Sequence, residues 1–426
     1  MPYIKPFRGV VYNKKKVGNL SKVVSPPYDI IPKEMQEELY RAHPNNFVRL
    51  ELGKIEPSDN VADNRYTRAK KFMDEWLKDN ILTKDDKESI YIYSQKYKTD
   101  GKTIDRIGFI ALMSLEEGKK KVLPHENTLM APKVDRLDLM RSINANLSPI
   151  YVLYDDKSHA ILKILKKVCS QKNPYIDIMI EGIRNRAWRI DSPVAIKRIQ
   201  KVMRGANTFI ADGHHRFEVT RMYSRELEGK DVPQALKESS RHAMVYFVES
   251  KEDMLTVLPA HRLPKDIGGL KKDEMLGRLE KFFTIEKAPS LNAMMSKLGK
   301  LNKAHVFGAY FGHGQFYILK LKSMRPVENA IKDKPGDWKK LDVAILHLFI
   351  FQHVLGIRDE DDNVEFVKSP AETAKFVDRG DFKAAFFLNP TRVDQIKRIA
   401  KLGEKMPRKA TYFYPKPLSG IVVNKF

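Results

Sequence analysis

The segment with the clearest potential for chemistry is FIADGHHRFEVTRMY, residues 209–223. An apolar strand is predicted to end at Asp212, and Gly213 permits a sharp turn before a helix. The first turn of that helix is predicted to hold His214, His215 and Arg216. A helix start exposes backbone N–H groups and the positive end of the helix dipole, which together favour phosphate. Because an arginine can donate to two phosphate oxygens and a histidine to a third, the segment predicts an anion site.

The alternative interpretation is that Asp212 only caps the helix and that the two histidines are ordinary surface groups. Aspartate is a common N-cap, so that part of the alternative is strong. Three cationic or proton-carrying side chains at a positive helix end repel one another unless an anion is present, and this favours the anion site. Asp212 is then a candidate catalytic carboxylate and metal ligand. Adjacent histidines point about 100° apart on a helix and converge poorly on one metal ion.

A second candidate follows the double proline of SPPYDII, residues 25–31. Two consecutive prolines predict an extended or turn segment rather than a helix. A rigid loop can aim the carboxylate of Asp29 at a substrate hydroxyl and accept its proton as a general base. An ordinary turn, which Pro and Asp favour, is the alternative.

A third candidate is the polar segment LPHENT, residues 123–128, and the residues that follow it. His125, Glu126, Asp135 and Arg136 place an imidazole, two carboxylates and a cation close together in sequence. Mg²⁺ prefers one or two carboxylates together with phosphate oxygens, so the segment predicts a site for a phosphate–Mg²⁺ group. Glu126 is a candidate ligand of that ion and a second candidate base. A polar loop with a surface ion pair is the equal alternative.

Basic residues near both ends of the chain are weaker candidates for phosphate binding. Arg8 lies in KPFRG, and Lys409 and Lys416 lie in RKATYFYPK. Two basic, aromatic segments of this kind can close over an anion, although a solvated lysine is the default interpretation.

The elements that must position these residues alternate between strands and helices. SIYIYSQKYK and RIGFIALMSL alternate apolar and polar residues, which predicts two strands joined by a tight turn at Thr99–Lys102. The character of the chain changes near residue 250. We therefore expect a mixed α+β fold with a first part, residues 1–250, that carries ADGHHR, and a second α+β part, residues 251–426, that contributes to the same site. Helices are predicted at 62–79, 158–170, 194–202, 271–283 and 339–355.

The composition indicates a globular protein of the cytoplasm. The chain has 426 residues, of which 42% are hydrophobic, and a single cysteine, Cys169, which excludes an internal disulfide and a thiolate zinc site. It shows no apolar run of membrane-spanning length and no signal-peptide core near the start. The formal charge of +23 favours an anionic partner, but the lysines are scattered, which favours a solvated surface over nucleic-acid binding.

Common phosphate-binding and nucleophile motifs are absent from the sequence. There is no GxxxxGK[ST] loop, no kinase HRD or DFG set and no GxSxG elbow. Phosphate chemistry in this chain therefore needs another scaffold.

Eight motifs in a fixed order resemble a family long described as a conserved domain of unknown function. They span nearly the whole chain and are PFRG (6–9), SPPYD (25–29), HENT (125–128), DR (135–136), SPI (148–150), ADGHHR (211–216), LPAHR (258–262) and TYFYPKPLSG (411–420). The family in turn resembles the free-serine kinases of the ParB–sulfiredoxin superfamily. The resemblance implies a ParB/sulfiredoxin-like kinase core in residues 1–250, L-serine as acceptor, inorganic pyrophosphate as donor, and Mg²⁺. The implied product is O-phospho-L-serine, which feeds cysteine synthesis.

The resemblance also assigns roles to individual residues. Gly213, His214, His215 and Arg216 match the phosphate-binding box of the superfamily. An acidic residue near the N-terminus is the base in the related kinases; Asp29 is its best match, and Glu126 competes with it. Where relatives have serine before Thr-Tyr-Phe this sequence has Ala410, which leaves Lys409, Thr411 and Lys416 to bind phosphate.

Two other functions stay open at this level. One is an ADP- or ATP-dependent serine kinase on the same scaffold, which a comparison of the donors distinguishes. The other is a non-enzymatic, ParB-like regulator that binds nucleic acid, which would bind heparin or DNA with a steep salt dependence. The sequence fixes no oligomeric state.

Overall fold

The computed structural model describes residues 3–99, 101–115, 122–123, 130–357 and 363–426, and it divides into two compact units. Unit 1 consists of the chain up to Leu255 together with the C-terminal segment Pro415–Phe426, and unit 2 is Thr256–Tyr414. The expected division at 250/251 lies close to the end of the first run. The expected second part, residues 251–426, includes Pro415–Phe426, and this last segment belongs to unit 1.

Unit 1 is built on a mixed eight-stranded sheet. Strands β7 and β11 pair in parallel, and the other neighbours pair antiparallel. β4 and β5 form the predicted hairpin, with Thr99 opposite Lys102. The chain is therefore of the mixed α and β class, as expected. The sheet order is β10 (Thr208–Asp212), β7 (Ile150–Tyr154), β11 (His242–Glu249), β5 (Lys102–Ser114), β4 (Ile90–Thr99), β9 (Ile183–Ile190) and β8 (Ile176–Ile180), with β1 (Ile4–Lys5) on β5.

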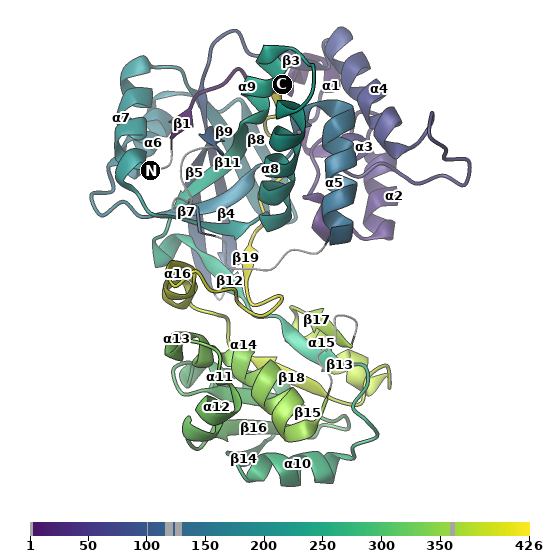
Figure 1. Ribbon diagram of the computed structural model, residues 1–426, viewed down its shortest axis with the longest axis vertical. Coiled ribbons are helices and arrows are strands. Elements are labelled where there is room, and N and C mark those ends of the chain that lie inside the picture. Colours follow the sequence, from purple (N-terminus) through teal and green to yellow (C-terminus); the bar gives the residue numbers. More distant parts are fainter. Residues whose placement is uncertain (1–2, 100, 116–121, 124–129, 358–362) are drawn as a thin grey trace. The chain divides into compact units, whose positions relative to one another are not determined.

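Two groups of helices cover this sheet (Figure 1). Helices α6 (Ala160–Gln171) and α7 (Pro193–Gly205) bury Ile161 and Ile199 against strand residues such as Phe109. Helices α8 (His214–Glu228), α5 (Met130–Ile143) and α4 (Arg65–Lys78) pack beside one another, away from α6 and α7. A small apolar cluster with Leu137, Val219 and Tyr223 holds α5 to α8. The predicted helices at 62–79, 158–170 and 194–202 are confirmed in type, with ends that differ by a few residues.

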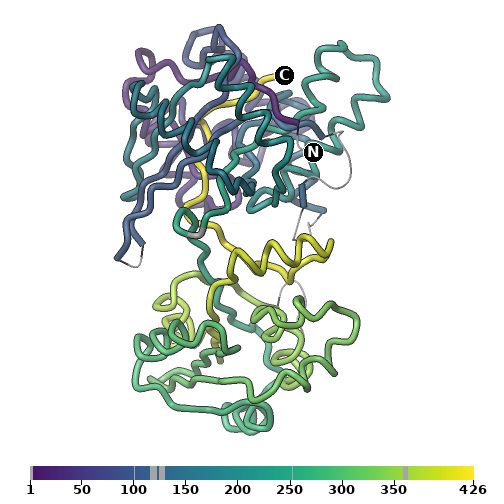
Figure 2. Tube along the Cα trace, turned by 90° about the vertical axis from the view of Figure 1, so that its left-hand side faces the viewer, coloured from purple at the N-terminus to yellow at the C-terminus, as the bar shows by residue number. Residues whose placement is uncertain are grey.

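The first segment of unit 1 is mostly short elements, and the C-terminal segment runs among them (Figure 2). Isolated bridges join Val10 to Val423 and Ser25 to Ser419. The SPPYDII segment follows the expectation except that Tyr28–Ile30 forms one 3₁₀ turn. The elements are β2 (Val10–Tyr12), α1 (Lys14–Val17), η1 (Leu20–Lys22), η2 (Tyr28–Ile30), α2 (Lys33–Ala42), α3 (Val48–Glu51) and β3 (Leu82–Lys84), and later β6 (Ala145–Asn146), α9 (Gln234–Ser240), η3 (Glu252–Met254) and β20 (Asn424–Lys425), which pairs with β6.

Unit 2 has its own six-stranded antiparallel sheet and its own core. The order is β14 (Phe283–Ala288), β16 (Phe316–Leu321), β15 (Val306–Tyr310), β18 (Ala385–Leu388), β13 (His261–Pro264) and β17 (Val364–Val367), and β12 (Thr256–Leu258) pairs with β19 (Tyr412–Tyr414). The predicted helix at 339–355 is instead α14 (Asp342–Ala344) continued as a π-helix, η4 (Ile345–Leu355). The other helices are α10 (Lys272–Glu280), α11 (Leu291–Lys300), α12 (Arg325–Ala330), α13 (Gly336–Lys339), α15 (Pro370–Asp378) and α16 (Val393–Lys401). In the described parts of the chain, no helix combines the length and apolar character needed to cross a membrane.

Candidate functional site

The corner between β10 and α8 begins with a β-bulge at the edge of the sheet. Ile210 lies opposite Val152, but Asp212 lies opposite Tyr151, so Ala211 is an extra residue in β10. Because side chains alternate between the faces of a sheet, an unbroken strand would put Asp212 on the same face as Ile210. The bulge places Asp212 on the other face, the one that carries Tyr151.

Helix α8 starts at His214, as predicted, and its N-cap is Gly213. The alternative in which Asp212 caps the helix is wrong, because the cap residue has no side chain and the Asp212 carboxylate bonds elsewhere. Gly213 has a φ of 91°, in the left-handed region that glycine adopts freely. A Cβ atom here would also lie 3.0 Å from the Nε atom of Arg216. Gly213 thus lets the Arg216 guanidinium fold back against the corner.

Four of the predicted site residues form a connected group of ion pairs. The Lys416 ammonium pairs with the Asp29 carboxylate and lies 2.7 Å from Asp212 Oδ1. Arg216 Nη2 donates to the other oxygen, Oδ2, of Asp212 at 2.6 Å. Although 387 sequence positions separate Asp29 from Lys416, both belong to unit 1. We call Asp29, Asp212, Arg216 and Lys416 the charged cluster.

Burial and charge oppose each other within the charged cluster. Burial alone would raise the pKa of Asp212, but Lys416 and Arg216 outweigh it and hold this pKa well below its usual range. Burial would lower the pKa of Lys416, but the two aspartates outweigh it and raise the pKa. The Lys416 side chain is only 6% exposed, whereas the Asp29 side chain is 33% exposed. A solvent-borne ligand therefore reaches the cluster from the Asp29 side.

The lowered pKa of Asp212 predicts an acid-sensitive contribution to stability. Ionised Asp212 stabilises the fold above about pH 4, the ordinary pKa of an unfolded aspartate, and this contribution is lost as the pH falls towards the lower folded pKa. Asp212→Asn should therefore unfold more easily than the native protein at pH 7, and the difference in unfolding free energy should shrink below pH 4. Urea titrations at several pH values measure it. Asp231→Asn, an exposed control, should show almost no difference at any pH, and an Asp212→Asn difference that does not change with pH would contradict the expectation.

The backbone around Lys416 is held by polar residues from the middle of the sheet. The fully buried Arg106 donates to the carbonyl oxygen of Pro415, and Gln95 Nε2 donates to that of Lys416 at 3.2 Å. The Tyr93 hydroxyl accepts from the Leu418 amide at 3.3 Å. These bonds explain how a segment from the far end of the chain brings an ammonium group to the β10–α8 corner.

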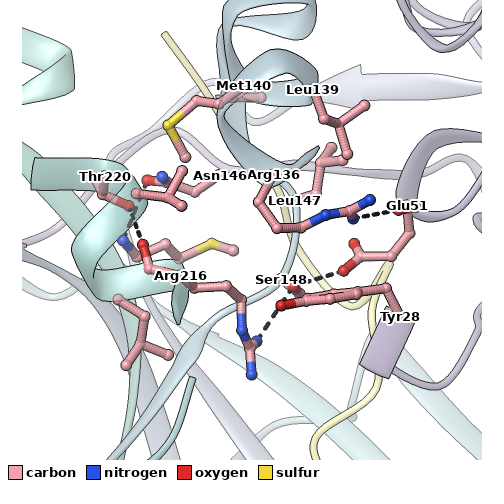
Figure 3. Close-up of a pocket in the computed structure, with 14 residues that line it drawn as sticks. Tyr28, Glu51, Arg136, Leu139, Met140, Asn146, Leu147, Ser148, Arg216 and Thr220 are labelled. Carbon is pink, nitrogen blue, oxygen red and sulfur yellow. Dashed lines mark hydrogen bonds between the residues drawn. The ribbon is translucent and has the colours of Figure 1, made fainter. Parts of the chain in front are cut away.

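A pocket lies next to the charged cluster, with Arg216 as part of its wall (Figure 3). It encloses about 470 Å³ of space, part of which is open to solvent. Arg216 Nη1 donates to Ser148 Oγ at 3.2 Å and to the Pro149 carbonyl at 2.5 Å. Ser148 Oγ donates to Glu51 Oε1 at 2.9 Å. The lining residues are Tyr28, Glu51, Arg136, Leu139, Met140, Ala145, Asn146, Leu147, Ser148, Ile150, Arg216, Val219, Thr220 and Met244.

Arg136, a predicted site residue, lines this pocket, and Asp135 holds it in place. The Arg136 guanidinium stacks 4.2 Å from the centre of the Tyr28 ring and donates to the Glu51 carbonyl at 2.6 Å. Asp135 accepts from Arg136 Nε at 2.7 Å and also pairs with Arg65. Burial raises the pKa of Tyr28 to about 12, so its hydroxyl stays protonated at neutral pH. Asp135 is thus a partner of Arg136 rather than a wall of the pocket.

The other predicted residues lie in different surroundings. His214 is buried and His215 is half-buried in the first turn of α8. Arg8 is exposed and donates to the Asp85 carbonyl at 2.8 Å, so it is not brought to the charged cluster. Lys409 is an exposed residue of unit 2. The predicted His125 and Glu126 lie outside the described residues.

The residues that the structure describes contain no group of three His, Cys, Asp or Glu side chains suited to a metal ion. Two carboxylates, Asp29 and Asp212, do converge on one ammonium group. Mg²⁺ needs only one or two carboxylates when phosphate oxygens and water complete its shell, so this donor set fits Mg²⁺ bound together with a phosphate ligand.

Three residues of this site were absent from the sequence prediction. Glu51 is hidden in the segment VRLEL, residues 48–52, where a carboxylate that directly follows buried Leu50 was the available signal. Ser148 opens the SPI motif, which marked the family but suggested no role. Arg106 lies in a strand with an ordinary alternating pattern, and nothing local distinguishes it.

Comparison with known families and structures gives one family match. The chain matches the family described as "Protein of unknown function (DUF1015)" over residues 4–344. No curated protein matches it. Among solved structures, it is similar to a mutant free serine kinase in complex with AMP, with 13% identity and a TM-score of 0.36 over 71% of this chain and 87% of the other. It is also similar to a conserved hypothetical protein from Pyrococcus furiosus, with 13% identity and a TM-score of 0.36 over 74% of this chain and 94% of the other. SbnI with a C-terminal truncation from Staphylococcus aureus has 11% identity and a TM-score of 0.35 over 73% of this chain and 85% of the other.

Proposed function

The chain belongs to the DUF1015 family, and we propose that it is a phosphotransferase that phosphorylates free L-serine with inorganic pyrophosphate. The observation that carries the proposal is the charged cluster at the start of α8. It joins two buried cations, two carboxylates and a glycine-capped helix start at one corner of unit 1. The sequence resemblance of ADGHHR to the phosphate-binding box of free-serine kinases supplies the acceptor and the donor.

The charge balance of the cluster indicates the kind of anion that it takes. Asp29 and Asp212 offset the charges of Lys416 and Arg216, so the cluster has little net charge of its own. A bare phosphate gains little Coulomb attraction there, whereas a phosphate that carries its own divalent cation meets carboxylates and cations together. We propose that Asp212 would hold Mg²⁺ together with Asp29 or Glu126, and that the other of these two carboxylates stays free to act as the base. When bound, Mg²⁺ neutralises charge on the donor phosphates.

The residues of the chain then have separate tasks. The amides of the first turn of α8 and the Arg216 guanidinium bind oxygens of the transferred phosphoryl group. The serine hydroxyl oxygen attacks the phosphorus, a new P–O bond forms, the bridging P–O bond of pyrophosphate breaks, and phosphate leaves. The hydroxyl proton passes to a carboxylate, for which Asp29 is the exposed described candidate and Glu126 the alternative. Most of the rate enhancement comes from positioning and charge stabilisation.

The test is direct formation of phosphoserine. The full chain is incubated with L-serine, Mg²⁺ and pyrophosphate, and the products are examined by mass spectrometry. We expect O-phospho-L-serine and one phosphate per turnover, and no product when Mg²⁺ is chelated. Parallel reactions with ADP or ATP in place of pyrophosphate identify the donor. If phosphoserine forms with ADP or ATP but not with pyrophosphate, the donor is a nucleotide. If no phosphoserine forms with any of the three donors, the proposed function is contradicted.

A further inference from the structure

The wall of the pocket beside the charged cluster contains a buried carboxylate oxygen that has no hydrogen-bond partner among the described residues. Glu51 is 2% exposed, and its Oε1 accepts from Ser148 Oγ at 2.9 Å. No group among the described residues donates to Oε2. A buried acceptor left without a donor destabilises the fold, so such an atom in a pocket wall is suited to a donor on a ligand.

The walls around Glu51 carry charge of the opposite sign and apolar surface. Arg136 and Arg216 face the same pocket, and Figure 3 shows Glu51, Ser148 and Tyr28 between them. Leucine, isoleucine, valine and methionine side chains line much of the remaining wall. Burial raises the pKa of Glu51, and the two arginines offset this only in part. A carboxylate in such surroundings gains more from a ligand cation than one in water does.

We infer that Glu51 recognises the ammonium group of an amino-acid acceptor through Oε2. This inference rests on the proposed function and deepens it by assigning the acceptor subsite. A free amino acid carries a carboxylate and an ammonium group together, and the pocket wall offers two guanidinium groups and one buried carboxylate oxygen that has no donor among the described residues. Arg216 is shared between this pocket and the charged cluster, so an acceptor bound here lies next to the donor phosphate.

The experiment compares two ligands that differ only at the amine. L-Glycerate has the carbon skeleton, carboxylate and terminal hydroxyl of L-serine, with a hydroxyl in place of the ammonium group. Calorimetry on the full chain should show that the native protein prefers L-serine about 10-fold or more. Glu51→Gln should weaken L-serine binding about 10- to 100-fold, the range expected for a lost charged hydrogen bond, and leave L-glycerate binding within about 2-fold.

Glu249→Gln is the matched control. Glu249 is also buried and also has a carboxylate oxygen without a partner among the described residues, but it does not line this pocket and instead pairs with His159. The Glu249→Gln variant should bind L-serine and L-glycerate as the native protein does. Retained binding of pyrophosphate with Mg²⁺ by Glu51→Gln shows that the variant is folded.

The outcomes separate this inference from the proposed function. Equal weakening of serine and glycerate binding, unchanged serine binding in Glu51→Gln, or no serine binding by the native protein would each overturn the inference. If Glu51 is instead the general base, Glu51→Gln should bind L-serine as the native protein does but lose turnover. If serine binding depends on Glu51 but no phosphoserine forms with any donor, the inference stands and the proposed function fails.

Discussion

Replacing Arg216 by alanine should reduce phosphoserine formation by about 10³-fold or more, the range expected for an arginine that stabilises a transferring phosphoryl group. Arg216 is 9% exposed, and its guanidinium joins Asp212, Ser148 and the Pro149 carbonyl, so it links the donor side of the site to the pocket. Steady-state rates from phosphoserine measured by mass spectrometry give the effect. Arg216→Lys should be intermediate, since it keeps the charge but cannot bridge both sides.

The control for this substitution lies on the same helix. Arg225 is exposed on α8, and Arg225→Ala should change neither the rate nor the stability measurably. Arg216→Ala with native turnover would remove Arg216 from the site. A fold check by tryptophan fluorescence distinguishes lost chemistry from lost structure, because Trp76 and Trp188 are buried in unit 1.

Replacing Lys416 by methionine should lower the free energy of unfolding of unit 1 by about 3–5 kcal/mol, the usual effect of removing one partner from a buried ion pair. Without the ammonium group, the like charges of Asp29 and Asp212 lose the cation that they share, and the more buried Asp212 is left with its Arg216 ion pair. Urea unfolding followed by tryptophan fluorescence measures the loss. The experiment uses a Trp338→Phe background, since Trp338 belongs to unit 2.

A second substitution tests whether charge is the cause. In the Lys416→Met background, Asp212→Asn removes one of the two carboxylates and should recover part of the lost stability. Lys96→Met, at an exposed position of β4, should change the unfolding free energy by less than about 0.5 kcal/mol. If the double variant is no more stable than Lys416→Met alone, lost packing rather than charge explains the effect.

The sequence predicted the elements well because their signals are local. Alternating residues and a D-G step define the β4–β5 hairpin, and an apolar strand followed by glycine defines the β10–α8 corner. In β10, however, regular alternation of side chains would place Asp212 on the face of Ile210, which is the wrong face. The one-residue bulge at Ala211 that changes this carries no distinctive sequence signal. The direction of the Asp212 side chain, and therefore its partners, needed the structure.

Long-range pairing was the other limit of prediction. Asp29, Asp212, Arg216 and Lys416 were all named as candidates from the sequence, but the convergence of the two aspartates on the Lys416 ammonium group was not foreseeable. The two ion pairs of Lys416 are specified by how the C-terminal segment packs on unit 1, through Arg106, Gln95 and Tyr93. Local composition cannot show which distant segments meet. Glu51 was missed for the same reason, because only the residues that surround it in the pocket identify it as a candidate site residue.

The return of Pro415–Phe426 to unit 1 has a consequence for synthesis of the protein in the cell. Translation proceeds from the N-terminus, so every residue of unit 2 is made before Lys416 emerges. Until then, the nascent first unit holds two acidic groups with no ammonium between them. An unfinished chain can therefore fold much of its first sheet and still lack the charged cluster until Lys416 has been made.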